Sequence, residues 1–153
     1  MTHRLSKPLA VLVAVVIGAV AAATSEASSS ATTLRLDGVP FRPELALTSA
    51  SRSLGLMNRR RAPVDGMLFV FPEDTTGGFW MKNTLVPLTI VFFNADGRRV
   101  RKLSMTPCRQ SSCPIYTPGR RYRFALELRA GDTRAARQLG PPAELGRLSR
   151  RAS

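Results

Sequence analysis

Hydrophobic and polar positions along this chain form short apolar runs that are separated by turn residues. Residues 122–128 (YRFALEL) alternate between the two kinds of position, with the period of a half-buried strand. Residues 66–71 (GMLFVF) and 88–94 (LTIVFFN) are almost continuous apolar runs, which predicts two more strands, the first ending at a proline. An Asp-Gly pair at 96–97 predicts a hairpin turn, after which residues 99–106 return as the partner strand.

Three further segments are predicted to be strands. Residues 33–38 alternate with period two and end in an Asp-Gly turn, and residues 43–49 form a second short strand. Residues 79–84 precede the run at 88–94, so the two form one long strand or two strands broken near Pro87. About seven strands with regular turn spacing favour a compact, single-domain, mainly β fold, either an antiparallel sandwich of jelly-roll type or a small open barrel.

Two segments are predicted to be short helices. Serines begin a helical turn within residues 49–63, and Gly55 interrupts it. Residues 131–140 (GDTRAARQLG) have the features of a second short helix, with Asp132 as its N-cap and Gly140 at its end.

The two ends of the chain differ in composition from its middle. A positive start, an apolar segment at residues 9–23 and small residues after it are typical of a secretory signal peptide over residues 1–27. The alternative is an uncleaved membrane anchor, for which the apolar segment is near the lower length limit and rich in alanine. Residues 28–40 are then a flexible lead-in and first strand, residues 41–140 the folded domain, and residues 141–153 a basic tail that we expect to be disordered.

Export would place the only two cysteines, Cys108 and Cys113, in an oxidising compartment. Their close spacing in TPCRQSSCPIY predicts a disulfide that closes a short loop. A zinc site would need two more ligands, and the only histidine, His3, lies in the segment that we expect to be removed. We therefore expect neither a metal nor a cofactor.

The charge of the chain is strongly positive, because 23 lysines and arginines outnumber 10 acidic residues and give a net charge of +13. This charge suits an anionic partner such as an envelope polymer, or it belongs to a solvated surface. No run of five or six basic residues occurs, and the aromatic residues do not alternate with arginines, so we expect no nucleic-acid partner. We expect a monomer that binds an anionic envelope component or a small ligand and meets the membrane only if the signal segment stays uncleaved.

A set of ordered motifs gives the sequence a family resemblance. The motifs are Gly55-Leu56-Met57, Gly66-Met67-Leu68-Phe69, Phe79-Trp80-Met81-Lys82-Asn83-Thr84, Pro87-Leu88, Asp96-Gly97, the cysteine pair, Leu126-Glu127-Leu128 and Ala130-Gly131. In this order, over residues 41–140, they resemble the exported, uncharacterised family called domain of unknown function 192. The resemblance implies a compact, mainly β domain of sandwich or jelly-roll type, often behind a signal peptide, and it implies no agreed activity.

The candidate chemistry centres on one acid. Without a histidine after His3, no Ser-His-Asp or Cys-His nucleophile can be assembled. Glu127 lies within a predicted strand and faces away from its apolar neighbours, so it needs a partner if that side is enclosed. Lys82 is the natural partner, and we hypothesise a Lys82–Glu127 pair. The alternative is an ion pair that only fixes the strand register, or two independent solvated residues.

Trp80, the only tryptophan, has two interpretations. It stacks on a ligand ring, with Lys82 and Asn83 supplying hydrogen bonds, or it fills the core. The candidate ligand site is therefore Trp80, Lys82, Asn83 and Glu127, with no catalytic residue assigned.

The expected function is that of an exported β domain that binds an extracytoplasmic ligand or envelope component. The alternatives are a carboxylate- and lysine-dependent enzyme acting on envelope saccharides, and a structural envelope protein without a small-molecule site.

Overall fold

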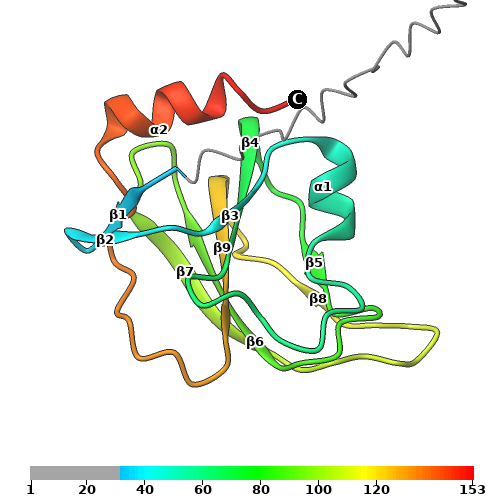
Figure 1. Cartoon of the computed structure of the whole chain (residues 1–153). Helices are drawn as coiled ribbons and strands as arrows, with labels where there is room; N and C mark the ends of the chain where they lie inside the picture. The colour runs from blue at the N-terminus through cyan, green and yellow to red at the C-terminus, as the bar shows by residue number, and fades with distance from the viewer. Residues whose placement is uncertain (1–31) are drawn as a thin grey trace, which may run out of the picture.

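A five-stranded sheet forms the centre of the molecule (Figure 1), seen in a computed structural model that describes residues 32–153. The predicted signal peptide lies outside the described residues. Three of the four strand pairings in this sheet are antiparallel, while β3 pairs parallel with β4. In spatial order the strands are β3 (Glu44–Ala46), β4 (Met67–Thr75), β9 (Tyr122–Arg129), β6 (Leu88–Phe93) and β7 (Arg99–Met105).

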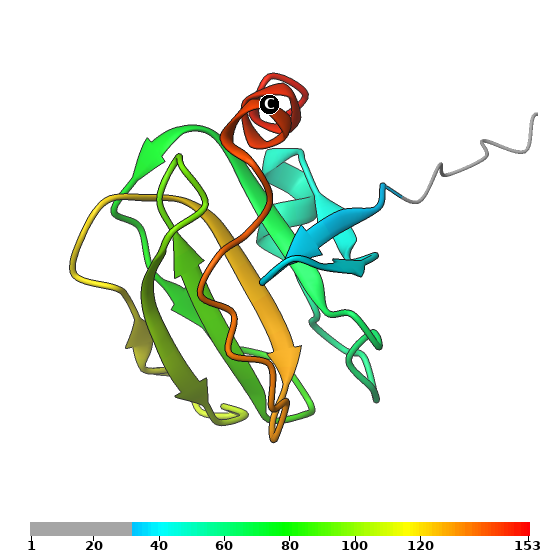
Figure 2. The same ribbon diagram turned by 90° about the vertical axis from the view of Figure 1, so that its left-hand side faces the viewer.

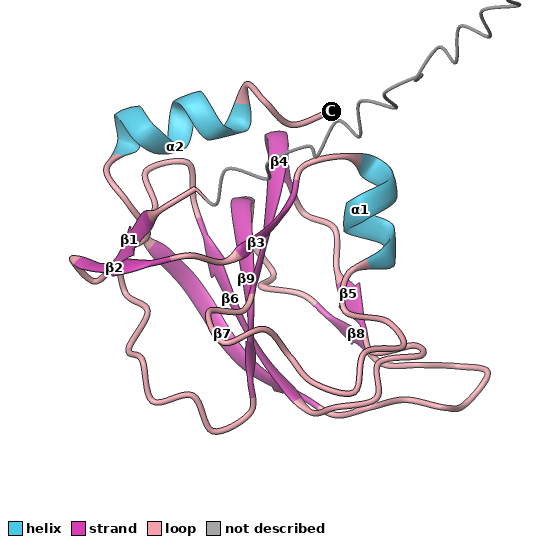
Figure 3. Ribbon diagram, in the orientation of Figure 1, coloured by secondary structure: helices cyan, strands magenta, loops and turns pink. Residues whose placement is uncertain are grey.

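Two small hairpin-like sheets and two short helices complete the fold (Figure 3). Strands β1 (Leu34–Leu36) and β2 (Val39–Phe41) pair with each other around the predicted Asp37-Gly38 turn. Strands β5 (Phe79–Trp80) and β8 (Ile115–Tyr116) form the other pair. The helices are α1 (Ser49–Leu54) and α2 (Pro142–Ser149). The predicted fold class is confirmed: the domain is mainly β with short helices, and its sheets stay open.

Both faces of the large sheet are covered, and this explains the continuous apolar runs of the sequence. All six residues of β6 are buried. On one face, Val91 and Leu126 pack with Leu145 of α2. On the other face, Ile90 and Phe92 pack with Leu56, which follows α1. Figure 2 shows α2 at the end of the sheet and α1 beside it.

The segment 79–84 contains only the short strand β5, so the two predicted runs form two separate strands. Backbone hydrogen bonds close a turn immediately afterwards, with Thr84 N–H donating to the carbonyl of Met81 over 3.1 Å. Asn83 takes a positive φ of 55° within this turn, a conformation that asparagine tolerates better than most residues. The turn ends β5 well before Pro87.

Strand β4 continues past Pro72 to Thr75, whereas the sequence predicted that it would stop there. Its pairing with β9 shifts between Val70 and Thr75. Such an irregularity tolerates a proline, because the missing N–H there breaks no regular ladder bond.

Residues 131–140 form no helix, which corrects the second helix prediction. The Asp132 carboxylate accepts from the backbone N–H of Arg134 at 3.0 Å, as an N-cap would, but no helix follows, and Ala136 takes a positive φ of 50°. Isolated bridges join Gln138 to Arg98 and Leu139 to Leu36. Pairing with two neighbouring segments therefore satisfies this backbone instead of helical bonds.

Residues Pro142–Ser149 form α2 in place of the predicted disordered tail. Pro142 lies at the start of the helix, where its missing N–H costs nothing. Leu145 and Leu148, three positions apart, lie on one face and are buried against the sheet. Two leucines at helical spacing are thus enough to dock this basic segment. No helix within residues 32–153 is long and apolar enough to cross a membrane.

Candidate functional site

A pocket of about 320 Å³ lies between α1 and the sheet face that α1 covers. Helix α1 buries none of its own residues, so the space beneath it is not filled by its side chains. The helix is held in place by Arg52, whose guanidinium donates to the carbonyl oxygens of Leu47 at 2.6 Å and Val70 at 3.1 Å. The wall opposite α1 comes from β4, β5 and β9, and it includes Phe69, Phe71, Phe79, Trp80, Tyr122 and Glu127.

Aromatic rings form most of that wall. Phe69 and Phe79 meet edge to face with their centroids 4.9 Å apart, and Phe71 meets Tyr122 in the same way at 5.5 Å. Such contacts fix the rings, so the wall is rigid. Trp80 also lines the pocket and is 51% exposed, which excludes the interpretation that it fills the core.

Glu127 brings the only acidic side chain to this pocket among the described residues. It lies on the central strand β9, paired with Met67 of β4 and Ile90 of β6, and only 4% of it is exposed. None of the hydrogen bonds or salt bridges found within residues 32–153 involves its carboxyl group. Burial raises the pKa of this carboxyl from its ordinary value of 4.5 to about 8, so the neutral form predominates at pH 7.

The other ionisable groups of the pocket already have partners. Besides its bonds to Leu47 and Val70, Arg52 donates to a backbone oxygen of Ser153 at 2.9 Å. The Tyr122 hydroxyl donates to the carbonyl of Gly77 at 2.9 Å, and burial raises the pKa of this phenol above its usual range. Glu127 is therefore the ionisable group of the pocket that has no hydrogen-bond or salt-bridge partner within residues 32–153.

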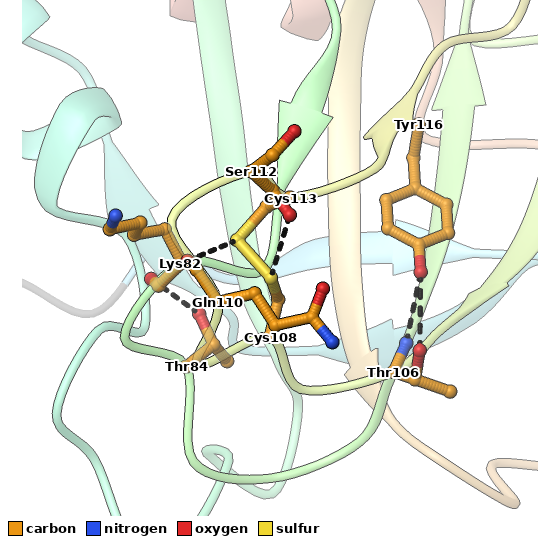
Figure 4. Close-up of a disulfide and its surroundings, with 8 residues drawn as sticks. All are labelled: Lys82, Thr84, Thr106, Cys108, Gln110, Ser112, Cys113 and Tyr116. Carbon is orange, nitrogen blue, oxygen red and sulfur yellow. Dashed lines mark hydrogen bonds between the residues drawn. A yellow bond between two sulfur atoms is a disulfide. The ribbon is translucent and has the colours of Figure 1, made fainter.

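The predicted pair of Lys82 and Glu127 is not formed. No salt bridge joins the two side chains in the part of the chain that the structure describes, and Lys82 does not line the pocket. The reason is the turn after β5, which leaves Lys82 beside the cysteine loop, where its backbone bridges to Cys108 (Figure 4). Asn83 is also outside the pocket, and its carbonyl accepts from the N–H of Asn58 at 2.8 Å.

The structure thus brings together two of the four predicted site residues, Trp80 and Glu127. The pocket also includes Arg52, Phe71 and Tyr122, which the sequence did not single out as site residues. No local motif marks Arg52, because its role depends on backbone oxygens from β4 and from the C-terminal segment. Tyr122 was predicted to be a strand residue, but it packs on the α1 side while Phe124 packs on the other, at the point where the pairing of β4 with β9 is irregular.

The predicted disulfide between Cys108 and Cys113 is present, with Cα atoms 5.8 Å apart. Its loop connects β7 to β8 and is attached to the segment after Trp80, since Cys108 N–H donates to the Met81 carbonyl at 3.2 Å. The disulfide therefore stabilises the loop that supports the β5 wall of the pocket.

The fold and the pocket together define a class of protein: a small, mainly β domain with an aromatic-walled pocket and a buried acid in that wall. The profile of the DUF192 family, described as Uncharacterized ACR, matches residues 32–140. The chain therefore belongs to the DUF192 family, as its motifs predicted.

Two crystal structures are similar to this chain. A protein from Sinorhizobium meliloti 1021, described as a candidate transcription regulator, is 30% identical, with 71% of this chain and 90% of that chain covered at a TM-score of 0.59. A protein of unknown function from Novosphingobium aromaticivorans is 29% identical, with 74% and 76% covered at a TM-score of 0.56. No protein of curated function matches the chain.

Proposed function

We propose that this protein is an exported domain that binds a small extracytoplasmic ligand in the pocket beneath α1. The observation that carries the proposal is Glu127, which lines the pocket, is almost fully buried and has no partner within the described residues. A carboxyl group removed from bulk water loses solvation, and a ligand that bonds to it restores part of that loss. Its oxygens are not among the side-chain atoms that are sealed from solvent without a partner, so a molecule in the pocket can reach them.

The size and lining of the pocket support the same proposal. Its volume of about 320 Å³ falls at the lower end of the range for small-molecule sites, which are mostly apolar with a few polar groups. The exposed face of Trp80 offers a stacking surface at the opening, while Glu127 offers the polar contact.

Binding is favoured over hydrolysis by the same residues. Glycoside hydrolysis normally needs two carboxyl groups across the scissile bond, and Glu127 is the only acid that lines the pocket in residues 32–153. Lysine-assisted chemistry would need Lys82, which lies outside the pocket.

Export is supported by the signal-peptide pattern at residues 1–27 and by the disulfide, which is typical of an oxidising compartment. The net charge of +13 supports an anionic envelope component as a second partner that the arginine-rich surface contacts.

A pair of tryptophan substitutions on α1 tests the pocket. Ser53 lines the pocket, so Ser53→Trp places an indole in it, whereas Ala50 is exposed and does not line it. A panel of small amines, sugars and aromatic acids is screened by thermal shift and by NMR chemical-shift changes. We expect ligands that bind the wild type and Ala50→Trp and bind Ser53→Trp at least tenfold more weakly. Equal binding to both variants, or no ligand in the whole panel, contradicts the proposal.

A further inference from the structure

We propose that the ligand is a small organic cation of the alkylammonium class, whose charge pairs with Glu127 while its alkyl groups lie against the aromatic wall. This inference rests on the proposed binding function and names the chemistry of the ligand. It follows from three features of the pocket: the charges that face Glu127, the nature of the wall, and the state of the other polar groups.

The first feature is that no lysine or arginine within residues 32–153 forms a salt bridge with Glu127. The strands on either side contribute Met67 and Ile90 at the same level, both apolar. The ionisable groups that line the pocket from other positions are Arg52 of α1 and Tyr122 of β9. Burial raises the pKa of Glu127, and the hydrogen bonds of Arg52 and Tyr122 go to backbone oxygens instead of to its carboxyl group. An ionised Glu127 would therefore gain its counter-charge from the ligand.

The second feature is the aromatic wall, which attracts cations through the negative faces of its rings. The wall already holds one cation, because the guanidinium carbon of Arg52 lies 5.1 Å from the centroid of Phe71. Trp80 is half exposed, and indole is the strongest cation–π acceptor among the side chains. An ammonium group can therefore contact a ring and the acid in the same pocket.

The third feature disfavours an anionic ligand. Arg52 is the only cation lining the pocket among the described residues, and three backbone oxygens already accept its guanidinium N–H groups. An anion would have to displace these bonds and would also meet the acid.

The pH dependence of the binding affinity distinguishes a cationic ligand from a neutral one. Glu127 is mostly neutral at pH 7, with a pKa of about 8, so the Glu127 carboxyl group loses its proton when a cation binds. Apparent affinity for a permanent cation should then rise about tenfold from pH 7 to pH 9, and it should level off above that range. A neutral ligand that accepts a hydrogen bond from the protonated acid would bind more weakly as pH rises.

Choline and its uncharged isostere 3,3-dimethylbutan-1-ol test the inference by isothermal titration at pH 7 and pH 9. We expect choline to bind at least tenfold more tightly than the alcohol at pH 9, with affinity rising about tenfold between the two pH values. Glu127→Gln should remove both the preference and the pH dependence. Glu73→Gln, which changes an exposed acid outside the pocket, should retain both.

Stronger binding of the alcohol, or choline affinity that does not change with pH, overturns the cation assignment. The wild-type pH series gives this answer even if Glu127→Gln folds poorly. If choline does not bind and the wider panel yields a neutral ligand that Ser53→Trp excludes, the proposed ligand class is wrong and the proposed binding function is supported. If the panel yields no ligand at all, both proposals are contradicted.

Discussion

Single residues set the close contacts around the buried acid. Gly66 precedes β4 and takes a positive φ of 76°, and a Cβ atom there would overlap the carbonyl oxygen of Glu127. The same Cβ atom would also lie 2.9 Å from the side chain of Leu128. Only glycine lets this turn approach the β9 backbone so closely, so Gly66 helps to fix the position of Glu127.

Substitution of this glycine measures that contact. Gly66→Ala should lower the free energy of unfolding by about 3 kcal/mol or more, because it adds an overlap to the cost of a positive φ. Gly119 is the matched control, since its φ is 71° and nothing lies within 4 Å of a Cβ built there. Gly119→Ala should cost only about 1 kcal/mol. Chemical denaturation measures both values, and equal costs would show that the approach to Glu127 is not tight.

At the scale of elements, the sequence pattern predicted the strands and turns that depend only on neighbouring residues. The alternation over 122–128 placed Glu127 opposite Leu126 and Leu128, and the structure has Leu126 and Leu128 in the cluster that α2 covers. The Asp-Gly turn at 96–97 joins β6 to β7 as predicted. These features follow from neighbouring residues alone, so the sequence was sufficient for them.

Elements that depend on distant partners were not predicted. Residues 131–140 carry helix-capping residues, but bridges from Gln138 to Arg98 and from Leu139 to Leu36 take the place of helical hydrogen bonds. The tail contains only a few apolar residues, and it becomes helical because Leu145 and Leu148 find a buried surface. The Lys82–Glu127 pair failed for a similar reason, since a turn after β5 turns Lys82 toward the cysteine loop. Of the four candidate residues, Trp80 and Glu127 line the pocket, and Lys82 and Asn83 do not.

At the scale of the whole molecule, the sheet separates two roles. One face packs against α2 and β1 through an apolar cluster that includes Leu36, Leu126 and Leu145. The other face, toward α1, contains the pocket with its aromatic wall and Glu127. In our proposal the ligand therefore binds on the α1 side of the sheet, while the opposite face serves packing alone.

The proposed export is tested on the whole chain. The protein should be recovered outside the cytoplasm with an N-terminus near residue 28, attached to the envelope fraction and released by high salt. Thiol titration of this material under denaturing conditions should find no free cysteine, because Cys108 and Cys113 are joined. Cytoplasmic recovery of the full-length chain, or two free thiols, would contradict export.

The central claim is that Glu127 is a buried acid without a partner in residues 32–153, and that it pairs with the proposed ligand. Carbon-13 NMR of the Glu127 side-chain carboxyl, followed from pH 4 to pH 10 in the free protein and with saturating choline, tests this claim most directly. The account predicts a titration midpoint near pH 8 in the free protein, because burial disfavours the charged form, and a midpoint at least one unit lower with choline bound. A midpoint near the ordinary value of 4.5 in the free protein would contradict it.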